Sequence, residues 1–177
     1  MASTCACATT KVATCPRGRW GALWVRGASR ALGYWQQAER TAAAFKGEWY
    51  VTGDLGSRDA LGYFTYAGRG DDMLKVAGKW VAPAEVEDCL LAHEAVKECA
   101  VVGLTDTHGL TKPCAFVVLQ AGSAAGELLA EELKAFVRQR LAPYKYPREI
   151  AFMEVLPRTH LGKVDRGQLR HEGSKAR

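Results

Sequence analysis

Apolar and polar positions divide the chain into an irregular start and a series of short strands and helices. Residues 1–19 show no periodicity and contain no acidic residue, so we expect a poorly ordered leader there. Beyond it, apolar runs predict strands at residues 23–25, 49–51 and 63–66. A short helix is predicted at residues 41–45, between the first two strands. The second strand is expected to end at Thr52-Gly53-Asp54. This stretch holds too few residues to close a core and is typical of the rim of a larger domain.

A more self-contained pattern follows residue 70. We expect a hairpin about Gly78, then a helix with Pro83 in its first turn. Further strands are predicted at 99–102, 114–119 and 150–155, and a long helix at 129–141. The polar segment 157–170 is expected to be a mobile loop and tail. Strands interleaved with two main helices predict an α+β fold, with both helices on one face of a small sheet.

Composition excludes some classes of protein. The 177 residues are 48% hydrophobic and 24% charged, which is typical of a globular protein. No apolar run approaches the roughly 18 residues of a membrane-spanning helix. The net charge of +5 is concentrated at the start, where residues 1–46 hold seven basic residues and one acidic residue. Because this excess lies in the least regular segment, it argues against nucleic-acid binding.

The cysteines predict reduced thiols. The six cysteines form no CxxC pair and lie at no metal-ligand spacing with the four histidines, so we expect no metal site. No secretory signal stands at the start, which predicts a cytoplasmic protein. The acid-poor leader would also fit an organelle transit peptide, although it lacks an amphipathic arginine helix.

Three positions could carry chemistry, each with a plainer alternative. The Asp54 carboxylate could hold the hydroxyl pair of a ribose, or cap its own turn. The Gly68-Arg69-Gly70-Asp71-Asp72 run could be a swivel, or a surface turn with a weak ion pair. Lys163 could reach into a cleft to neutralise developing charge, or be solvated as most loop lysines are.

Taken together, the motifs resemble a known family. Residues 21 to about 170 are similar to the C-terminal third of the AMP-forming acyl- and aryl-CoA synthetases, in the adenylate-forming superfamily, and most similar to benzoate-CoA ligases. The resemblance rests on an ordered series of motifs: Trp24–Gly27, Leu32–Trp35, Thr41–Phe45, Trp49–Asp54, Gly68–Lys75, Gly78–Glu87, Lys97–Gly103, Gly109–Pro113, Ala142–Pro147 and Leu156–Lys163.

The resemblance implies a reaction in two steps. A small carboxylic acid, with an aromatic acid such as benzoate favoured, reacts with ATP to give an acyl-adenylate and pyrophosphate, and the thiol of coenzyme A then displaces AMP. One active site serves both steps because a small C-terminal domain swings between two poses. The cofactors implied are ATP, coenzyme A and Mg²⁺, the last bound through a large N-terminal domain that residues 1–19 do not resemble.

Roles follow for individual residues by the same resemblance. Asp54 would bind the ribose hydroxyls with help from Arg69, and Asp71 would be the hinge residue. Lys163 would stabilise the adenylation transition state. Lys75 and Gly78 would face the active site in the thioester step, where the missing side chain of Gly78 lets the pantetheine arm pass. The family commonly has lysine in place of Arg158, and serine or threonine in place of Leu161.

The expected organisation is therefore a leader at 1–19, the tail of a nucleotide-binding domain at 20–69, a hinge at 70–71 and a C-terminal lid domain at 72–177. We expect the isolated chain to be inactive, and a truncated or wrongly started reading frame would explain its start. One alternative is a non-catalytic module that docks on a separate N-terminal subunit or a carrier protein. A less favoured one is the tail of a peptide-synthetase adenylation domain, since no carrier domain follows Arg170.

Overall fold

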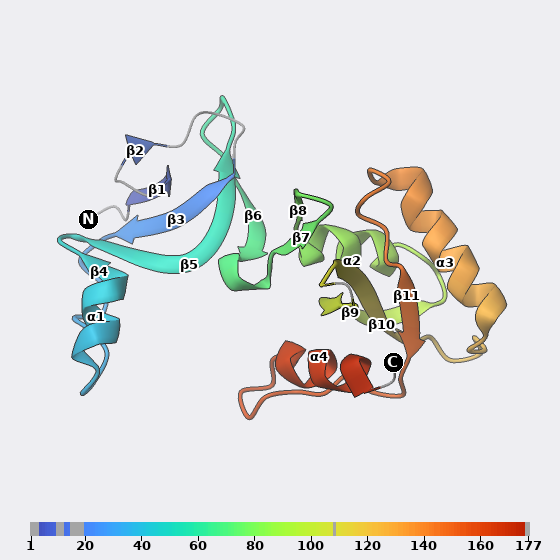
Figure 1. Ribbon diagram of the computed structural model, residues 1–177. Coiled ribbons are helices and arrows are strands. Elements are labelled where there is room, and N and C mark those ends of the chain that lie inside the picture. The colour runs from blue at the N-terminus through green and yellow to red at the C-terminus, as the bar shows by residue number, and fades with distance from the viewer. Residues whose placement is uncertain (1–3, 10–12, 15–19, 108, 176–177) are drawn as a thin grey trace. The chain divides into compact units, whose positions relative to one another are not determined.

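The computed structural model describes residues 4–9, 13–14, 20–107 and 109–175. The chain divides into two compact units, with the boundary between Asp71 and Asp72 (Figure 1). A short 3₁₀ turn, Gly70–Asp72, spans this boundary. Within the described residues, no helix is long and apolar enough to cross a membrane.

The first unit is built on one antiparallel sheet in the order β2-β1-β3-β5-β4, with β6 also paired to β5. Its elements are β1 (Thr4–Thr9), β2 (Ala13–Thr14), β3 (Gly21–Arg26), α1 (Ala38–Ala44), β4 (Phe45–Lys46), β5 (Trp49–Arg58) and β6 (Phe64–Arg69). Strands β3, β5 and β6 and helix α1 lie where the apolar pattern predicts them. Trp24 and Ala67 are the buried apolar side chains of this unit among those described.

Two expectations for this unit differ from the structure. Residues 4–9, placed in a poorly ordered leader by the sequence, pair with β3 as strand β1, with Thr4 opposite Arg26 and Ala8 opposite Ala22. Residues 1–3, 10–12 and 15–19 of that leader lie outside the described residues. Strand β5 does not end at Thr52-Gly53-Asp54 but continues to Arg58 through an irregularity, which the β3–β5 register shows as a shift between Ala22 and Trp24.

The second unit combines a two-stranded hairpin, a three-stranded sheet and three helices. The elements are β7 (Leu74–Val76), β8 (Lys79–Val81), α2 (Pro83–Leu91), β9 (Val96–Thr105), β10 (Thr111–Leu119), α3 (Glu127–Arg140), β11 (Glu149–Phe152) and α4 (Arg166–Lys175). In the sheet, β10 lies between antiparallel β9 and parallel β11. The predicted hairpin about Gly78 and the helix opened by Pro83 are confirmed.

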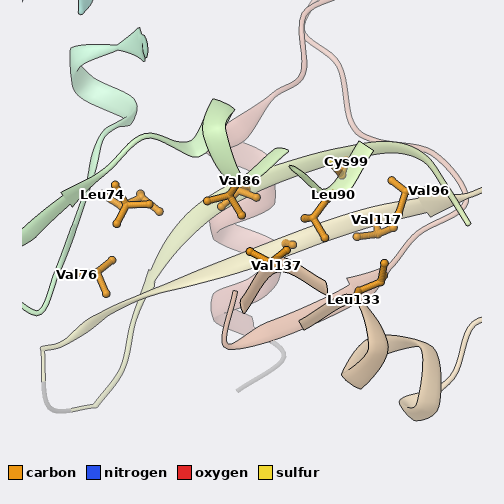
Figure 2. Packing of buried hydrophobic residues seen from close by; sticks show 12 residues of the cluster. Leu74, Val76, Val86, Leu90, Val96, Cys99, Val117, Leu133 and Val137 are labelled. Carbon is orange, nitrogen blue, oxygen red and sulfur yellow. The ribbon is translucent and has the colours of Figure 1, made fainter. Parts of the chain in front are cut away.

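Alternate side chains of β9 and β10 build two separate hydrophobic clusters. On one face, Val101 and Val117 pack with Val86 and Leu90 of α2 and with Leu133 and Val137 of α3 (Figure 2). This confirms that the two predicted main helices cover the same face. On the other face, Val102, Leu104, Cys114 and Phe116 pack with Leu156 and with Leu169 of α4.

The sequence pattern does not predict helix α4, since it indicates a mobile loop and tail at residues 157–170. Leu169 is fully buried and anchors the helix in the second cluster. The first turn is capped by Asp165, whose Oδ1 accepts a hydrogen bond from the Gln168 backbone at 3.0 Å. One apolar residue in a polar segment gives little periodic signal, which explains the error. The predicted strand at 150–155 is also shorter, because β11 ends at Phe152 and Val155 is exposed.

Candidate functional site

Three of the predicted site residues lie together in the first unit. Asp54 and Arg69 are opposite each other in the β5–β6 pairing. Arg69 Nη1 lies 3.4 Å from Asp54 Oδ1 and donates to the Thr52 carbonyl at 2.9 Å. Arg69 Nε lies 3.3 Å from Asp71 Oδ1. One guanidinium therefore joins the carboxylates of Asp54 and Asp71.

The irregularity in β5 explains how Asp54 is presented. Gly53 has a φ of +79°, a conformation that favours glycine, and a Cβ there would lie 2.9 Å from Arg69 Nη2. The hydroxyl of Thr52 donates to the Leu23 carbonyl and accepts from the Asp54 backbone, both at 3.0 Å. These bonds replace the regular ladder at the bulge and fix the Asp54 backbone.

The neighbouring carboxylates favour the charged form of the Arg69 guanidinium. Burial opposes the charge on Arg69, but the carboxylates of Asp71 and Asp54 outweigh it and raise the pKa of Arg69 above its usual value. The Asp54 side chain is 29% exposed. Its second oxygen, Oδ2, accepts no hydrogen bond from any described residue. Asp54 can therefore accept hydrogen bonds from a ligand while Arg69 holds Oδ1.

A cavity of about 390 Å³ also lies in this unit, which sequence reasoning did not identify. Its lining includes Arg30, Tyr34, Phe45, Tyr50 and Thr52. The Tyr34 and Tyr50 hydroxyls are hydrogen-bonded at 3.2 Å, and this bond, with burial, raises the pKa of Tyr50. No motif marks the cavity, because its aromatic residues come from three separate segments.

Lys75 and Gly78 share the β7–β8 hairpin of the second unit. Ala77 and Gly78 both have positive φ, +48° and +78°, as a two-residue hairpin turn of type I′ requires. Nothing lies within 4 Å of a Cβ built on Gly78, so the turn is open. Lys75 is exposed, with its Nζ 6.0 Å from the ring centroid of Trp80.

Lys163 lies on a short hydrogen-bonded loop between Leu156 and α4. Arg158 and Val164 form an isolated bridge across its base, and the Thr159 backbone donates to the Lys163 carbonyl at 2.7 Å. Gly162, with a φ of +78°, makes the turn that precedes Lys163. The Lys163 side chain is exposed, and its ammonium pairs with no described residue. Lys163 is therefore a cation without a partner among the described residues, on a loop whose backbone is held by hydrogen bonds.

The sequence did not predict the contacts that six charged residues make around this loop and the start of α4. Arg158 donates to the Gly162 carbonyl at 2.9 Å and pairs with Glu98 of β9. Arg166 donates to Glu87 Oε1 at 2.6 Å and to the Val101 carbonyl at 2.8 Å, and Asp72 lies between Arg166 and Arg170. The ion pairs among these residues join positions that are 60 to 98 residues apart in the sequence. Local sequence motifs give no signal for contacts of this range.

The arrangement has no metal centre in the described part of the chain, since no three His, Cys, Asp or Glu side chains gather there as ligands. Cys89, Cys99 and Cys114 form no disulfide with any described residue. Burial raises the pKa of Cys99 to about 12, with Glu87 and Asp88 acting in the same direction. This thiol is therefore protonated and unreactive at neutral pH.

Comparisons with known proteins extend this picture. Residues 85–163 match the family described as AMP-binding enzyme C-terminal domain. The chain is 54% identical over 150 residues to a benzoate–CoA ligase of Thauera aromatica, covering 85% of this chain and 28% of that protein. It is 48% identical over 151 residues to a 4-hydroxybenzoate–CoA/benzoate–CoA ligase of Rhodopseudomonas palustris, with the same coverage. The chain thus spans somewhat more than a quarter of these relatives.

Solved structures give the same result. An anthranilate CoA ligase in complex with anthranoyl-AMP matches 98% of this chain with a TM-score of 0.91 and 41% identity, over 34% of its own length. A benzoate CoA ligase from Burkholderia xenovorans LB400 matches 95% of this chain with a TM-score of 0.87 and 48% identity, over 33% of its own length. The second unit therefore belongs to the AMP-binding enzyme C-terminal domain family, and the chain corresponds to the C-terminal part of adenylate-forming CoA ligases.

Proposed function

We propose that this chain is the C-terminal part of an ATP-dependent, AMP-forming carboxylic acid–CoA ligase. In the first step, a carboxylate oxygen bonds to the α-phosphorus of ATP and pyrophosphate leaves, which gives an acyl-adenylate. In the second, the sulfur of coenzyme A bonds to the acyl carbon, AMP leaves, and the thiol proton passes to solvent. The observation that carries the proposal is Lys163, an exposed ammonium that pairs with no described residue, on a hydrogen-bonded loop of a unit that belongs to this family.

Lys163 serves the first step in this proposal. The attacking carboxylate and the triphosphate are both anionic, so their approach is opposed by charge repulsion. An ammonium placed between the carboxylate and the α-phosphate offsets this repulsion and stabilises the charge that develops in the transition state. The absence of a competing carboxylate partner among the described residues leaves Lys163 available for this role.

Asp54 and Arg69 hold the nucleotide. The Oδ2 of Asp54, which accepts no hydrogen bond from a described residue, accepts hydrogen bonds from the ribose hydroxyls, and Arg69 orients the carboxylate through Oδ1. Mg²⁺, when bound with ATP, would screen the phosphate charges. We assign its ligands to protein outside this chain.

Asp71 is the proposed hinge, between a nucleotide-binding segment at 20–69 and a lid at 72–177. The division of the chain into compact units on either side of this residue supports the assignment. Rotation about the hinge brings Lys163 to the active site for the first step and the β7–β8 hairpin for the second. Lys75 then faces the site, and the bare turn at Gly78 leaves room for the pantetheine arm.

An aromatic acid such as benzoate is the proposed substrate. The relatives that support this are the ligases for benzoate, at 54% identity, and for 4-hydroxybenzoate or benzoate, at 48%. A long-chain-fatty-acid–CoA ligase of Bacillus subtilis is 41% identical over 152 residues, which makes the aliphatic class a weaker match. We place the reaction in the cytoplasm, in keeping with the reduced thiol of Cys99.

A second candidate is a non-catalytic module that docks on a separate N-terminal subunit. The observation that favours it is the exposure of large apolar side chains in the first unit, with Leu32 97% and Trp35 85% exposed. Both proposals predict that the 177-residue chain alone does not form an adenylate. Stable co-purification with a larger subunit, and no adenylation by the pair, would favour the docking module.

A chimeric ligase tests the catalytic proposal. Residues 20–177 would replace the matching segment of the Thauera aromatica benzoate–CoA ligase, and benzoate-dependent exchange of pyrophosphate into ATP would be measured. We expect exchange by the chimera and none by the isolated chain. A folded chimera without exchange, or exchange by the isolated chain, would contradict the proposal.

A further inference from the structure

The guanidinium of Arg158 makes two contacts at once beside Lys163. Arg158 Nη1 donates to the carbonyl oxygen of Gly162 at 2.9 Å. Arg158 Nη2 pairs with Glu98 Oε1 on strand β9. The Gly162 carbonyl belongs to the peptide group that joins Gly162 to Lys163. Arg158 thus connects the backbone immediately before Lys163 to the central sheet of the second unit.

Other contacts shape the loop without fixing its tip to the sheet. The Thr159–Lys163 and Gly162–Thr159 backbone bonds lie within the loop itself. Leu156 is buried at the base, whereas Leu161 at the tip is 73% exposed and gives no packing anchor. Among the described residues, the Arg158–Glu98 link is therefore the polar connection between the loop tip and β9.

We propose that Arg158 is a positioning residue for Lys163, with Glu98 as its anchor. This rests on the proposed role of Lys163 in adenylation. The lysine side chain is long and flexible, so its ammonium is well placed only if its backbone is held. A shift of about 1 Å in a charged catalytic group lowers a rate by as much as about 100-fold. Fixing the Gly162–Lys163 peptide limits such shifts.

Arginine is suited to this task where lysine is not. Its planar guanidinium presents separate nitrogens in a fixed fork, so it can donate to the Gly162 carbonyl and to Glu98 together. A lysine at this position carries its three donors on a single nitrogen, so it would reach the Gly162 carbonyl and Glu98 together less readily than the fork of Arg158 does.

Hydrogen–deuterium exchange on the complete 177-residue chain tests the structural part. Arg158→Ala should raise the exchange rate of the Gly162 amide by about tenfold, because the loop opens more often. The Leu169 amide in α4 should keep its rate. Arg158→Lys and Glu98→Gln should give intermediate increases at Gly162. Equal rates at Gly162 in all four proteins would overturn the proposal.

The chimeric ligase tests the catalytic part. Arg158→Ala should slow benzoate-dependent pyrophosphate exchange by about tenfold, with little change in the KM for ATP. Thioester formation from supplied benzoyl-adenylate should be unchanged, since Lys163 serves the first step. Arg158→Lys should restore part of the exchange rate. Lys134→Ala, which removes an ion pair with Glu131 on α3, is the matched control and should change neither step.

The outcomes separate this inference from the proposed function. If the unmodified chimera does not exchange pyrophosphate, the proposed function fails, and the exchange rates of the 177-residue chain still judge the loop contact. If the chimera is active and Arg158→Ala slows both half-reactions equally, Arg158 has only a structural role and the inference is wrong. Unchanged exchange activity in Arg158→Ala also overturns it.

Discussion

Asp54 and Arg69 face each other across strands β5 and β6, with 3.4 Å between Asp54 Oδ1 and Arg69 Nη1. The same guanidinium reaches Asp71 at the boundary of the two units, through Nε at 3.3 Å. The proposed nucleotide-binding carboxylate and the proposed hinge therefore share one cation. A ligand hydrogen-bonded to Asp54 would act on the group that also holds Asp71.

Asp54→Asn should weaken nucleotide binding in the chimeric ligase. The amide keeps the shape but loses the negative charge and one acceptor, so the KM for ATP should rise about tenfold, with a smaller change in kcat. Steady-state kinetics of pyrophosphate exchange would measure this. Glu48→Gln, at an exposed carboxylate of the same unit, is the control and should leave the KM for ATP unchanged. An equal rise in both variants would exclude a ribose-binding role for Asp54.

Lys163→Ala should separate the two half-reactions. Loss of the ammonium removes charge stabilisation from the first step, so pyrophosphate exchange by the chimera should fall at least about 100-fold. Thioester formation from supplied benzoyl-adenylate should persist. The exposed loop position predicts little effect on unfolding, less than about 0.5 kcal/mol. A Lys163→Ala chimera that retains full exchange activity would rule out the proposed role.

Gly78→Ala and Gly109→Ala form a matched pair for the thioester step. Both glycines have positive φ, +78° and +75°, and neither has a neighbour within 4 Å of an added Cβ. Each alanine should therefore cost about 1 kcal/mol of stability through backbone strain alone. Only Gly78→Ala should also slow the chimera's thioester formation. Equal rates in the two variants would mean that the turn at Gly78 does not border the pantetheine arm.

Arg166→Leu should destabilise the second unit. The substitution leaves the Glu87 carboxylate, 13% exposed, without its guanidinium partner. An uncompensated, largely buried charge costs about 3 kcal/mol. Urea unfolding followed by circular dichroism would detect the loss. Lys134→Ala, at an ion pair whose Glu131 carboxylate is 55% exposed, is the control and should cost less than about 0.5 kcal/mol. A loss no larger than that of the control would show that the Arg166–Glu87 pair contributes no net stability.

The raised pKa of the Cys99 thiol predicts that the folded chain loses stability at alkaline pH. Its pKa is raised from 9.0 to about 12 in the folded state. Below pH 9 the thiol is protonated whether the chain is folded or unfolded, so its titration does not yet lower the free energy of unfolding. Between these values only the unfolded chain releases the proton, so stability falls with rising pH, at a limiting slope of about 1.4 kcal/mol per pH unit.

Urea unfolding at pH 8 to 11 of the wild type and of Cys99→Ala would isolate this contribution from other alkaline titrations. The wild-type stability should fall more steeply with pH than that of the variant. Parallel pH dependences would show that Cys99 does not titrate abnormally.

The parts of the fold that were predicted are those with local signals. The hairpin turn needs positive φ, which Gly78 supplies, and Pro83 fits only the first turn of a helix. The apolar stripe of α3 is regular enough to identify the helix and its buried face. Asp54, Arg69 and Lys163 were singled out because glycines and charges mark their segments, and the first two are indeed in contact.

The errors have physical causes that lie outside local sequence. Strand β5 passes through the bulge at Gly53 because Thr52 and Arg69, from two different strands, replace the missing ladder bonds. Helix α4 depends on a single buried leucine, Leu169, and on a cap. The contacts of Arg158 and Arg166 join residues that only the folded sheet brings together. None of these long-range partners can be read from neighbouring residues.

Asp72 and Arg170 lie near opposite ends of the second unit in sequence, yet Asp72 Oδ1 and Arg170 Nη2 form an ion pair at 2.8 Å. The point where the chain enters this unit therefore lies beside its last helix. A module whose first and last elements lie side by side can be excised, permuted or inserted into another protein without stretching its connections. The second unit is in this sense a transferable part, and exchange of the proposed lid between ligases should leave its own fold intact.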